Sequence, residues 1–163
     1  TGANASLPHA GATRAKAKAG SIVLIDWGAR LDGYCSDLTR VVALGRMPAR
    51  LKEVYRIVLD AQLAAIDAIG PGRSGKAIDA VARKRISKAG YGAQFGHGLG
   101  HGIGLEIHEQ PTLSPTAQCD AATVSGLQGD DLEGMAGIYS LECQSNLVTL
   151  GSAGNMIVTW VCT

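Results

Sequence analysis

Two aspartates, Asp26 and Asp37, lie in IVLIDWGARLDGYCSDLTR, a stretch that otherwise has the composition of two hydrophobic strands. Ionised carboxylates are rarely buried without a partner. Side chains alternate along a strand, so a hairpin closing around Leu31 and Asp32 would place the two carboxylates directly opposite each other. Two carboxylates in that position repel each other, and burial makes the repulsion worse.

Three features could stabilise such a pair: a shared proton, a neighbouring Arg30 or Arg40, or a bound cation. The hairpin alone leaves the arginine and metal explanations equally good. The segment FGHGLGHGIGLEIHEQP favours the metal, because it brings His97, His101 and His108 within twelve residues. Neutral imidazole together with carboxylate suits a divalent transition metal such as Mn, Co, Fe or Zn.

The elements that must position these residues follow from periodicity. Strands are predicted at 21–28 and 34–44, joined by a turn that contains Asp32-Gly33. One-sided apolar patterns predict helices over 49–69 and 74–89. We expect these helices to pack on the side of the sheet away from the aspartates. A hairpin, two helices and then further strands, including strands around a Gly-rich turn in SNLVTLGSAGNMIVTWVCT, is the order of an α+β fold.

Composition excludes several other classes of protein. The net charge is +1 over 163 residues, and the short cluster Arg83-Lys84-Arg85 is expected to be a solvated helix face rather than a nucleic-acid patch. No apolar run approaches the ~20 residues that span a bilayer. The chain begins without Met or a hydrophobic leader, so we expect an excised segment. Its four cysteines lack CxxC spacing, which favours reduced thiols and a cytoplasmic setting.

The pair of motifs IDWGARLDGYCSDLTR and GHGLGHGIGLEIHEQP resembles the creatinase/aminopeptidase ("pita-bread") metallopeptidases. The similarity is closer to Xaa-Pro aminopeptidases and Xaa-Pro dipeptidases than to methionine aminopeptidases, and it runs from Thr1 to about Pro115. The resemblance implies an α+β pita-bread fold, in which a curved antiparallel sheet has helices on its outer face and metals on its inner face.

The resemblance also implies roles for individual residues. Asp26 matches a ligand of one metal, Asp37 matches a ligand that bridges two metals, and His101 matches a further ligand. The positions matching the substrate pocket are His9, His97 and His108, of which His97 and His108 are the catalytic candidates. The implied cofactors are two divalent ions (Mn, Co or Zn), and the implied substrate is a peptide with proline at its second position. No nucleic-acid or membrane partner is expected, and a homodimer is compatible with the sequence.

The family site contains two further glutamates, and here the sequence departs from the pattern. Met135 and Gly154 stand at the matching positions, and the spacing of Glu133 and Glu142 does not show that either one substitutes. We therefore expect a single metallopeptidase-like catalytic domain over 1–163, lacking its N-terminal part and carrying an atypical tail from about 116.

Two functions follow from this sequence. The first is a metallo-aminopeptidase of the Xaa-Pro type, or an Xaa-Pro dipeptidase, that uses a metal-activated water. The alternative is a catalytically inactive pseudopeptidase, or an incomplete fragment, with at most a weak metal site. Because Asp26 and Asp37 supply only two negative charges, we predict that the chain binds metal weakly and hydrolyses Xaa-Pro peptides poorly.

Overall fold

A computed structural model describes residues 1–70 and 72–117 and two short strands at 148–150 and 156–158. The helices are η1 (Gly2–Ser6), α1 (Ala49–Ile66), α2 (Gly75–Lys88) and η2 (Gly92–Gln94). The strands are β1 (Ile22–Trp27), β2 (Arg30–Leu31), β3 (Tyr34–Cys35), β4 (Leu38–Ala43), β5 (Gly100–Gly102), β6 (Glu109–Leu113), β7 (Val148–Leu150) and β8 (Met156–Val158). They pair antiparallel as β1–β4, β2–β3, β5–β6 and β7–β8. The predicted α+β order of a hairpin, two helices and further strands is confirmed for these residues.

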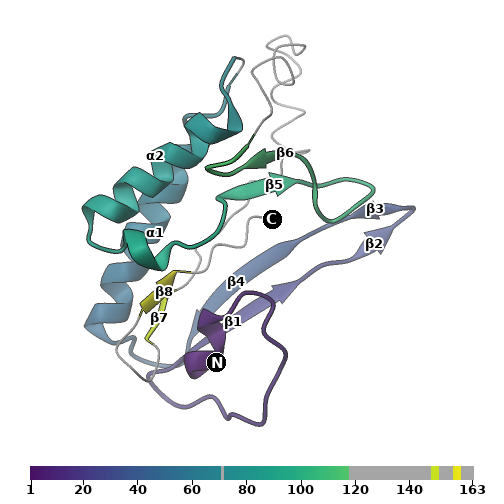
Figure 1. The fold of residues 1–163 in the computed structure, drawn as a ribbon. Helices are drawn as coiled ribbons and strands as arrows, with labels where there is room; N and C mark the ends of the chain where they lie inside the picture. Colours follow the sequence, from purple (N-terminus) through teal and green to yellow (C-terminus); the bar gives the residue numbers. More distant parts are fainter. Residues whose placement is uncertain (71, 118–147, 151–155, 159–163) are drawn as a thin grey trace.

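The first hairpin is long, and β2–β3 continues β1–β4 to its tip (Figure 1). The tip is a two-residue turn in which Asp32 has φ 50° and Gly33 has φ 92°. Positive φ at both positions is the geometry that twisted hairpins favour, and Asp-Gly is well suited to it. The predicted turn is therefore confirmed, but it closes one residue later than expected.

This change of closure corrects the expected pairing of the aspartates. Asp26 lies opposite Thr39, not opposite Asp37. Residues two apart on a strand share a face, so Asp37 becomes the diagonal neighbour of Asp26 on the same face. The diagonal arrangement moves the two carboxylates further apart than direct opposition would, while both still point to one side of the hairpin.

Gly28 allows the two strands to approach closely next to Asp37. A Cβ atom at Gly28 would overlap the carbonyl oxygen of Ser36. The Ser36 amide donates a hydrogen bond to the carbonyl of Ala29 (2.8 Å), and the Ala29 amide donates to the Ser36 hydroxyl (3.0 Å). Any larger residue at Gly28 would push the chain that carries Asp37 away from β1.

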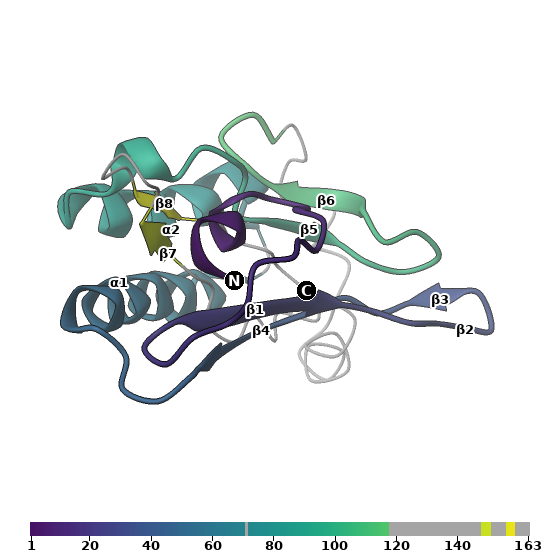
Figure 2. The ribbon, with the colours of Figure 1, turned by 90° about the horizontal axis from the view of Figure 1, so that it is seen from below.

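The main core lies between the two helices and the segment that leads to β5. In both views α1 and α2 lie side by side, with β5–β6 next to α2 (Figures 1 and 2). The buried members of this core are Val54, Val58, Ala61, Ala65, Ile78, Ala82, Ile86, Tyr91, Phe95 and Leu99. Ser74 caps α2 by accepting a hydrogen bond from the amide of Ala77 (3.2 Å). The apolar faces read from the sequence are thus buried mainly against each other.

The helices leave Asp26 exposed, as expected, but one contact differs from the expectation. Leu51, in the first turn of α1, packs in a cluster with Leu24 and Val41. These two strand residues lie opposite each other on the face that also carries Asp26 and Thr39. The first turn of α1 therefore reaches the aspartate-bearing face, at the pair of residues next to Asp26 and Thr39 on that face. The expectation that both helices pack on the opposite side is wrong for this contact, because alternation places aliphatic and acidic residues on one face.

In the part of the chain that the structure describes, no helix is both long enough and apolar enough to cross a bilayer.

Candidate metal centre

The two aspartates have different environments. Asp37 lies between β3 and β4 and is only 6 % exposed, whereas Asp26 near the end of β1 is exposed. The hydroxyl of Thr39, itself 1 % exposed, donates a hydrogen bond to Asp26 Oδ1 (3.1 Å). Thr39 thus shares a face with both aspartates and holds the exposed Asp26 carboxylate in place.

Asp37 is a carboxyl group whose surroundings oppose its charge. Burial raises the pKa of the Asp37 carboxyl above its usual range, and the neighbouring Asp26 carboxylate raises this pKa further. His101, His108 and His9 lower the pKa, without cancelling the increase. A cation held next to Asp37 would offset both burial and repulsion, so the environment suits a positively charged ligand.

The arginine explanation of the aspartate pair is not favoured by the structure. Arg30 donates hydrogen bonds to the carbonyls of Gly33 (3.2 Å) and Leu105 (3.1 Å). Arg40 lies opposite Ile25 in the ladder, on the face away from the aspartates. Neither arginine is therefore placed primarily to neutralise Asp37.

The β5–β6 hairpin brings the histidines to the first hairpin. His101 lies in β5 opposite Thr112, and His108 immediately precedes β6. The loop between them is tied to the first hairpin, because the Cys35 amide donates to the Gly104 carbonyl (2.7 Å). Two segments distant in sequence are thereby fixed next to each other.

Asp37, His101 and His108 converge on one point. One ligand atom from each lies within 4.8 Å of the others, and Nε2 of His101 is 3.9 Å from Oδ2 of Asp37. Nδ1 of His101 lies 2.9 Å from the carbonyl oxygen of Gly102. That oxygen can only accept, so Nδ1 carries the hydrogen of this bond, and in the neutral ring Nε2 keeps its lone pair on the side that faces Asp37.

The other two histidines surround this point at different distances. The rings of His101 and His108 have centroids 4.4 Å apart, and the ring of His9 lies 6.2 Å from that of His108. His97 is not in the cluster found among the described residues; its Nδ1 lies 2.7 Å from the Gly98 carbonyl and its ring packs edge-on against Phe95. The structure thus brings His9, His101 and His108 together, with His97 outside the group.

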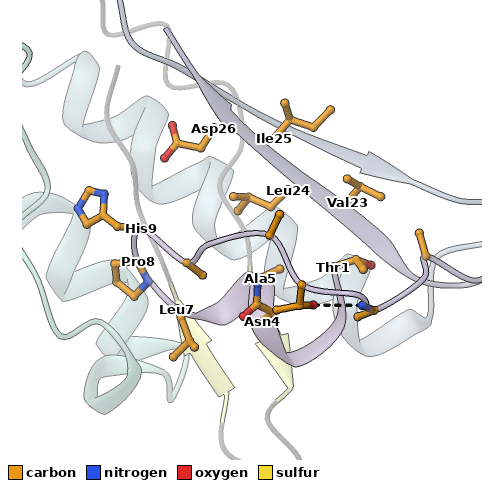
Figure 3. A pocket seen from close by; sticks show the side chains of 15 residues that line it. Thr1, Asn4, Ala5, Leu7, Pro8, His9, Val23, Leu24, Ile25 and Asp26 are labelled. Carbon is orange, nitrogen blue, oxygen red and sulfur yellow. Dashed lines mark hydrogen bonds between the residues drawn. The ribbon is translucent and has the colours of Figure 1, made fainter.

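A cavity of about 690 Å³ lies next to the centre, between the N-terminal segment and β1. Figure 3 shows His9 and Asp26 at the same end of this cavity. The rest of its wall consists largely of small or aliphatic side chains, among them Ala5, Leu7 and Leu24. The cavity therefore combines a polar end near the carboxylates with an apolar interior.

Two residues that the sequence reading missed support the histidine segment. Arg83, expected on a solvated face, is 26 % exposed and forms a two-pronged ion pair with Asp79, whose side chain is 2 % exposed (2.7 and 2.9 Å). Only its neighbours Lys84 and Arg85 are exposed as expected. The sequence could have predicted this ion pair from the i, i+4 spacing of Asp79 and Arg83. Asp79 is also next to the apolar Ile78 and Ala82, which lie on the inner face of the helix.

The donor set fits a divalent transition metal. Carboxylate oxygen and imidazole nitrogen are ligand types that Mn, Co and Zn accept, and Asp37 and His101 present one of each 3.9 Å apart, with His108 beside them. The Nδ1 contact of His101 is the outer hydrogen bond typical of metal-binding histidines. Met135, Gly154, Glu133 and Glu142 lie outside the described residues.

Comparison with known proteins is consistent with this geometry. The chain is 47% identical over 114 residues to an uncharacterized peptidase, YqhT, of Bacillus subtilis, covering 70% of this chain and 32% of that protein. It is 44% identical over 114 residues to an Xaa-Pro dipeptidase of Pyrococcus furiosus, covering 70% of this chain and 33% of the relative. The chain thus spans about a third of the length of the curated relatives it matches.

Solved structures of similar fold also include peptidases of the Xaa-Pro type. An X-Pro aminopeptidase from Thermotoga maritima superposes with a TM-score of 0.70 at 44% identity, covering 73% of this chain and 34% of that one. The prolidase from Pyrococcus furiosus also gives 0.70, at 42% identity, covering 73% and 35%. These neighbours confirm the expected pita-bread fold. The model of metallopeptidase family M24 matches residues 1–135, and the chain belongs to that family.

Proposed function

We propose that this chain carries the metal-binding part of an exopeptidase that hydrolyses the peptide bond before proline. The observation that carries the proposal is the convergence of Asp37, His101 and His108 on one point within an M24 fold. The names of relatives, Xaa-Pro dipeptidase and X-Pro aminopeptidase, support a peptide substrate with proline at its second position.

In this proposal Asp37 and His101 hold the metal, and Asp26 is the further ligand from the same face of the hairpin. Asp37 and His101 are already within 3.9 Å of each other, and Thr39 keeps the Asp26 carboxylate on that side. A divalent ion (Mn, Co or Zn) in this place would acidify a water molecule and polarise the scissile carbonyl. The intact family site would hold two such ions.

The remaining histidines would handle the substrate. His108, beside His101 and exposed, would donate a hydrogen bond from its imidazole to the scissile carbonyl oxygen. His9 at the polar end of the cavity would contact the residue before proline. The catalytic role of His97 stays a prediction from the family resemblance, because its ring packs against Phe95. The apolar interior of the cavity would exclude water from that end of the peptide.

A second function, a catalytically inactive relative, is favoured by one specific observation. The described centre supplies two carboxylates, and Met135 and Gly154 carry no charge at the positions matching the two other family ligands. Two negative charges would hold one divalent ion more readily than two. Loss of a general base alone typically costs a factor of ~10²–10⁴ in rate. We therefore propose single-ion binding and slow turnover for this chain.

One experiment separates the two functions. The purified chain is assayed on an Xaa-Pro peptide with excess Mn²⁺, Co²⁺ or Zn²⁺, alongside Asp37→Ala and the exposed control Asp60→Ala. Turnover that depends on metal and on Asp37, but not on Asp60, supports the peptidase. Metal binding without turnover supports the inactive relative. Failure to bind any of the three metals would contradict the peptidase and the single-ion site, and would favour an inactive relative without a metal.

The proposal extends to the setting of the protein. We propose one catalytic domain, a cytoplasmic location and no membrane or nucleic-acid partner, with self-association into a homodimer as the property to measure.

A further inference from the structure

We infer that Asp79 and Arg83 of α2 are positioning residues for the metal centre, although neither is placed to bind the metal. They hold the backbone of the segment that ends in His101, and this segment determines where the imidazole meets Asp37. The expected effect on metal binding rests on the proposed function. That the Asp79–Arg83 ion pair fixes the histidine segment is argued separately, from contacts within the chain.

Arg83 forms the centre of this arrangement. Its guanidinium donates to both carboxylate oxygens of Asp79, and it also donates to the carbonyls of Phe95 (2.8 Å) and His97 (2.7 Å). The same group lies over the ring of Phe95, 4.2 Å from its centroid. A planar group with five N–H donors can serve a carboxylate and two carbonyls at once, which an ammonium group cannot do in the same geometry.

Asp79 also bonds to the backbone of the segment that leads to His101. Its Oδ1 accepts a hydrogen bond from the amide of Leu99 (3.1 Å). The ion pair therefore bonds to Phe95, His97 and Leu99, which are alternate residues along one edge of the segment. It replaces the hydrogen bonds that a neighbouring strand would otherwise supply.

The histidine lies immediately beyond the last of these bonds. β5 begins at Gly100, so only one residue separates Leu99 from His101. Phe95 and Leu99 are each 2 % exposed in the core, so their side chains prevent the segment from sliding. A shift of Leu99 would therefore be transmitted to His101, which has to stay near Asp37.

Stability alone does not account for an ion pair in this place. Replacing a buried ion pair by well-packed apolar residues is often neutral or stabilising, because desolvation of the charges is costly. Apolar side chains at 79 and 83 could fill the same space, but they could not bond to the backbone at Phe95, His97 and Leu99. The directional bonds are the feature that only this pair provides.

The test uses conservative variants that keep the size and most of the polarity of the pair. Arg83→Lys and Asp79→Asn are compared with wild type and with Arg85→Lys, a matched substitution at an exposed position on the same helix. Far-UV circular dichroism selects conditions in which all four chains have the same helical content. Co²⁺ affinity is then measured by titration, and the imidazole ¹⁵N signals of His101 are recorded without metal.

We expect Arg83→Lys and Asp79→Asn to bind Co²⁺ roughly 10–100-fold more weakly than wild type while folded, as is typical of residues that orient metal ligands. The His101 signals should move in both variants and stay unchanged in Arg85→Lys. Unchanged Co²⁺ affinity and unchanged His101 signals in the two folded variants would overturn the inference.

Two further outcomes are also informative. If wild type binds no Co²⁺ but the His101 signals move in the variants, the proposed function fails and the positioning inference stands. If neither variant folds, amide exchange in wild type decides the question. The Leu99 amide should then exchange only through global unfolding, and faster local exchange would overturn the inference.

Discussion

Removal of the Asp79 carboxylate should be among the most damaging single substitutions in the described part of the chain. Asp79→Ala deletes the acceptor of three hydrogen bonds, at 2.7, 2.9 and 3.1 Å, two of them from the Arg83 guanidinium. Breaking a buried ion pair by removing one partner costs about 3–5 kcal/mol. Arg83 keeps two carbonyl acceptors and is 26 % exposed, which favours the lower end of that range.

The Leu99 amide adds to this cost. A buried N–H left without its acceptor costs about 1–3 kcal/mol, so the loss for Asp79→Ala should be about 4 kcal/mol overall. That is a large fraction of the ~5–15 kcal/mol by which domains are usually stable. The matched change Asp60→Ala, at an exposed position of α1, should cost less than about 0.5 kcal/mol.

Urea denaturation followed by circular dichroism measures both variants. The midpoint for Asp79→Ala should fall strongly while the slope of the transition stays that of wild type. A loss below about 1 kcal/mol with an unchanged slope would refute the reasoning, because the pair would then contribute little to the order of the histidine segment.

Three other substitutions probe the centre itself. Gly28→Ala should lower the free energy of unfolding by about 1–3 kcal/mol and weaken metal binding, whereas Gly96→Ala, with open space at its Cβ, should do neither in a denaturation and Co²⁺ titration series. His101→Ala should abolish Co²⁺ binding, while His108→Ala should keep the affinity within a few-fold; equal losses in the two titrations would show that His108 is a ligand. Because burial raises the pKa of Asp37 in the folded chain, the metal-free wild type loses stability as pH rises through that pKa. Asp37→Asn should therefore be more stable than wild type near neutral pH in thermal denaturation without metal, and its advantage should vanish below the ordinary pKa of an aspartate. An equal advantage at acidic pH would exclude ionisation as its cause.

Local signals made the first half of the fold predictable. The Asp32-Gly33 turn is an interaction between neighbouring residues, and the helical periodicity near Val54 and Ile78 reports burial on one face. The register was harder to predict, because Asp-Gly can occupy more than one place in a turn. A shift of one residue in the turn moved the partner of Asp26 from Asp37 to Thr39.

The parts of the site that were missed depend on contacts between distant segments. The sequence indicates that His101 and Asp37 are chemically suited to each other, but their approach depends on the bond from Cys35 to Gly104. The Arg83 side chain likewise points inward because its guanidinium bonds to carbonyl groups more than ten residues away. Every residue has a backbone carbonyl, so residue types do not show which carbonyls will accept a hydrogen bond. Periodicity alone therefore could not distinguish Arg83 from an exposed arginine.

A visible-absorption titration with Co²⁺ tests the central claim, that Asp37 and His101 form a metal centre, most directly. The wild-type chain should develop the d–d bands of nitrogen and oxygen coordination and reach saturation at about one equivalent, the limit set by two carboxylates. The bands should be lost in Asp37→Ala and kept in Asp60→Ala. Absence of the bands in wild type, or equal bands in Asp37→Ala, would contradict the account.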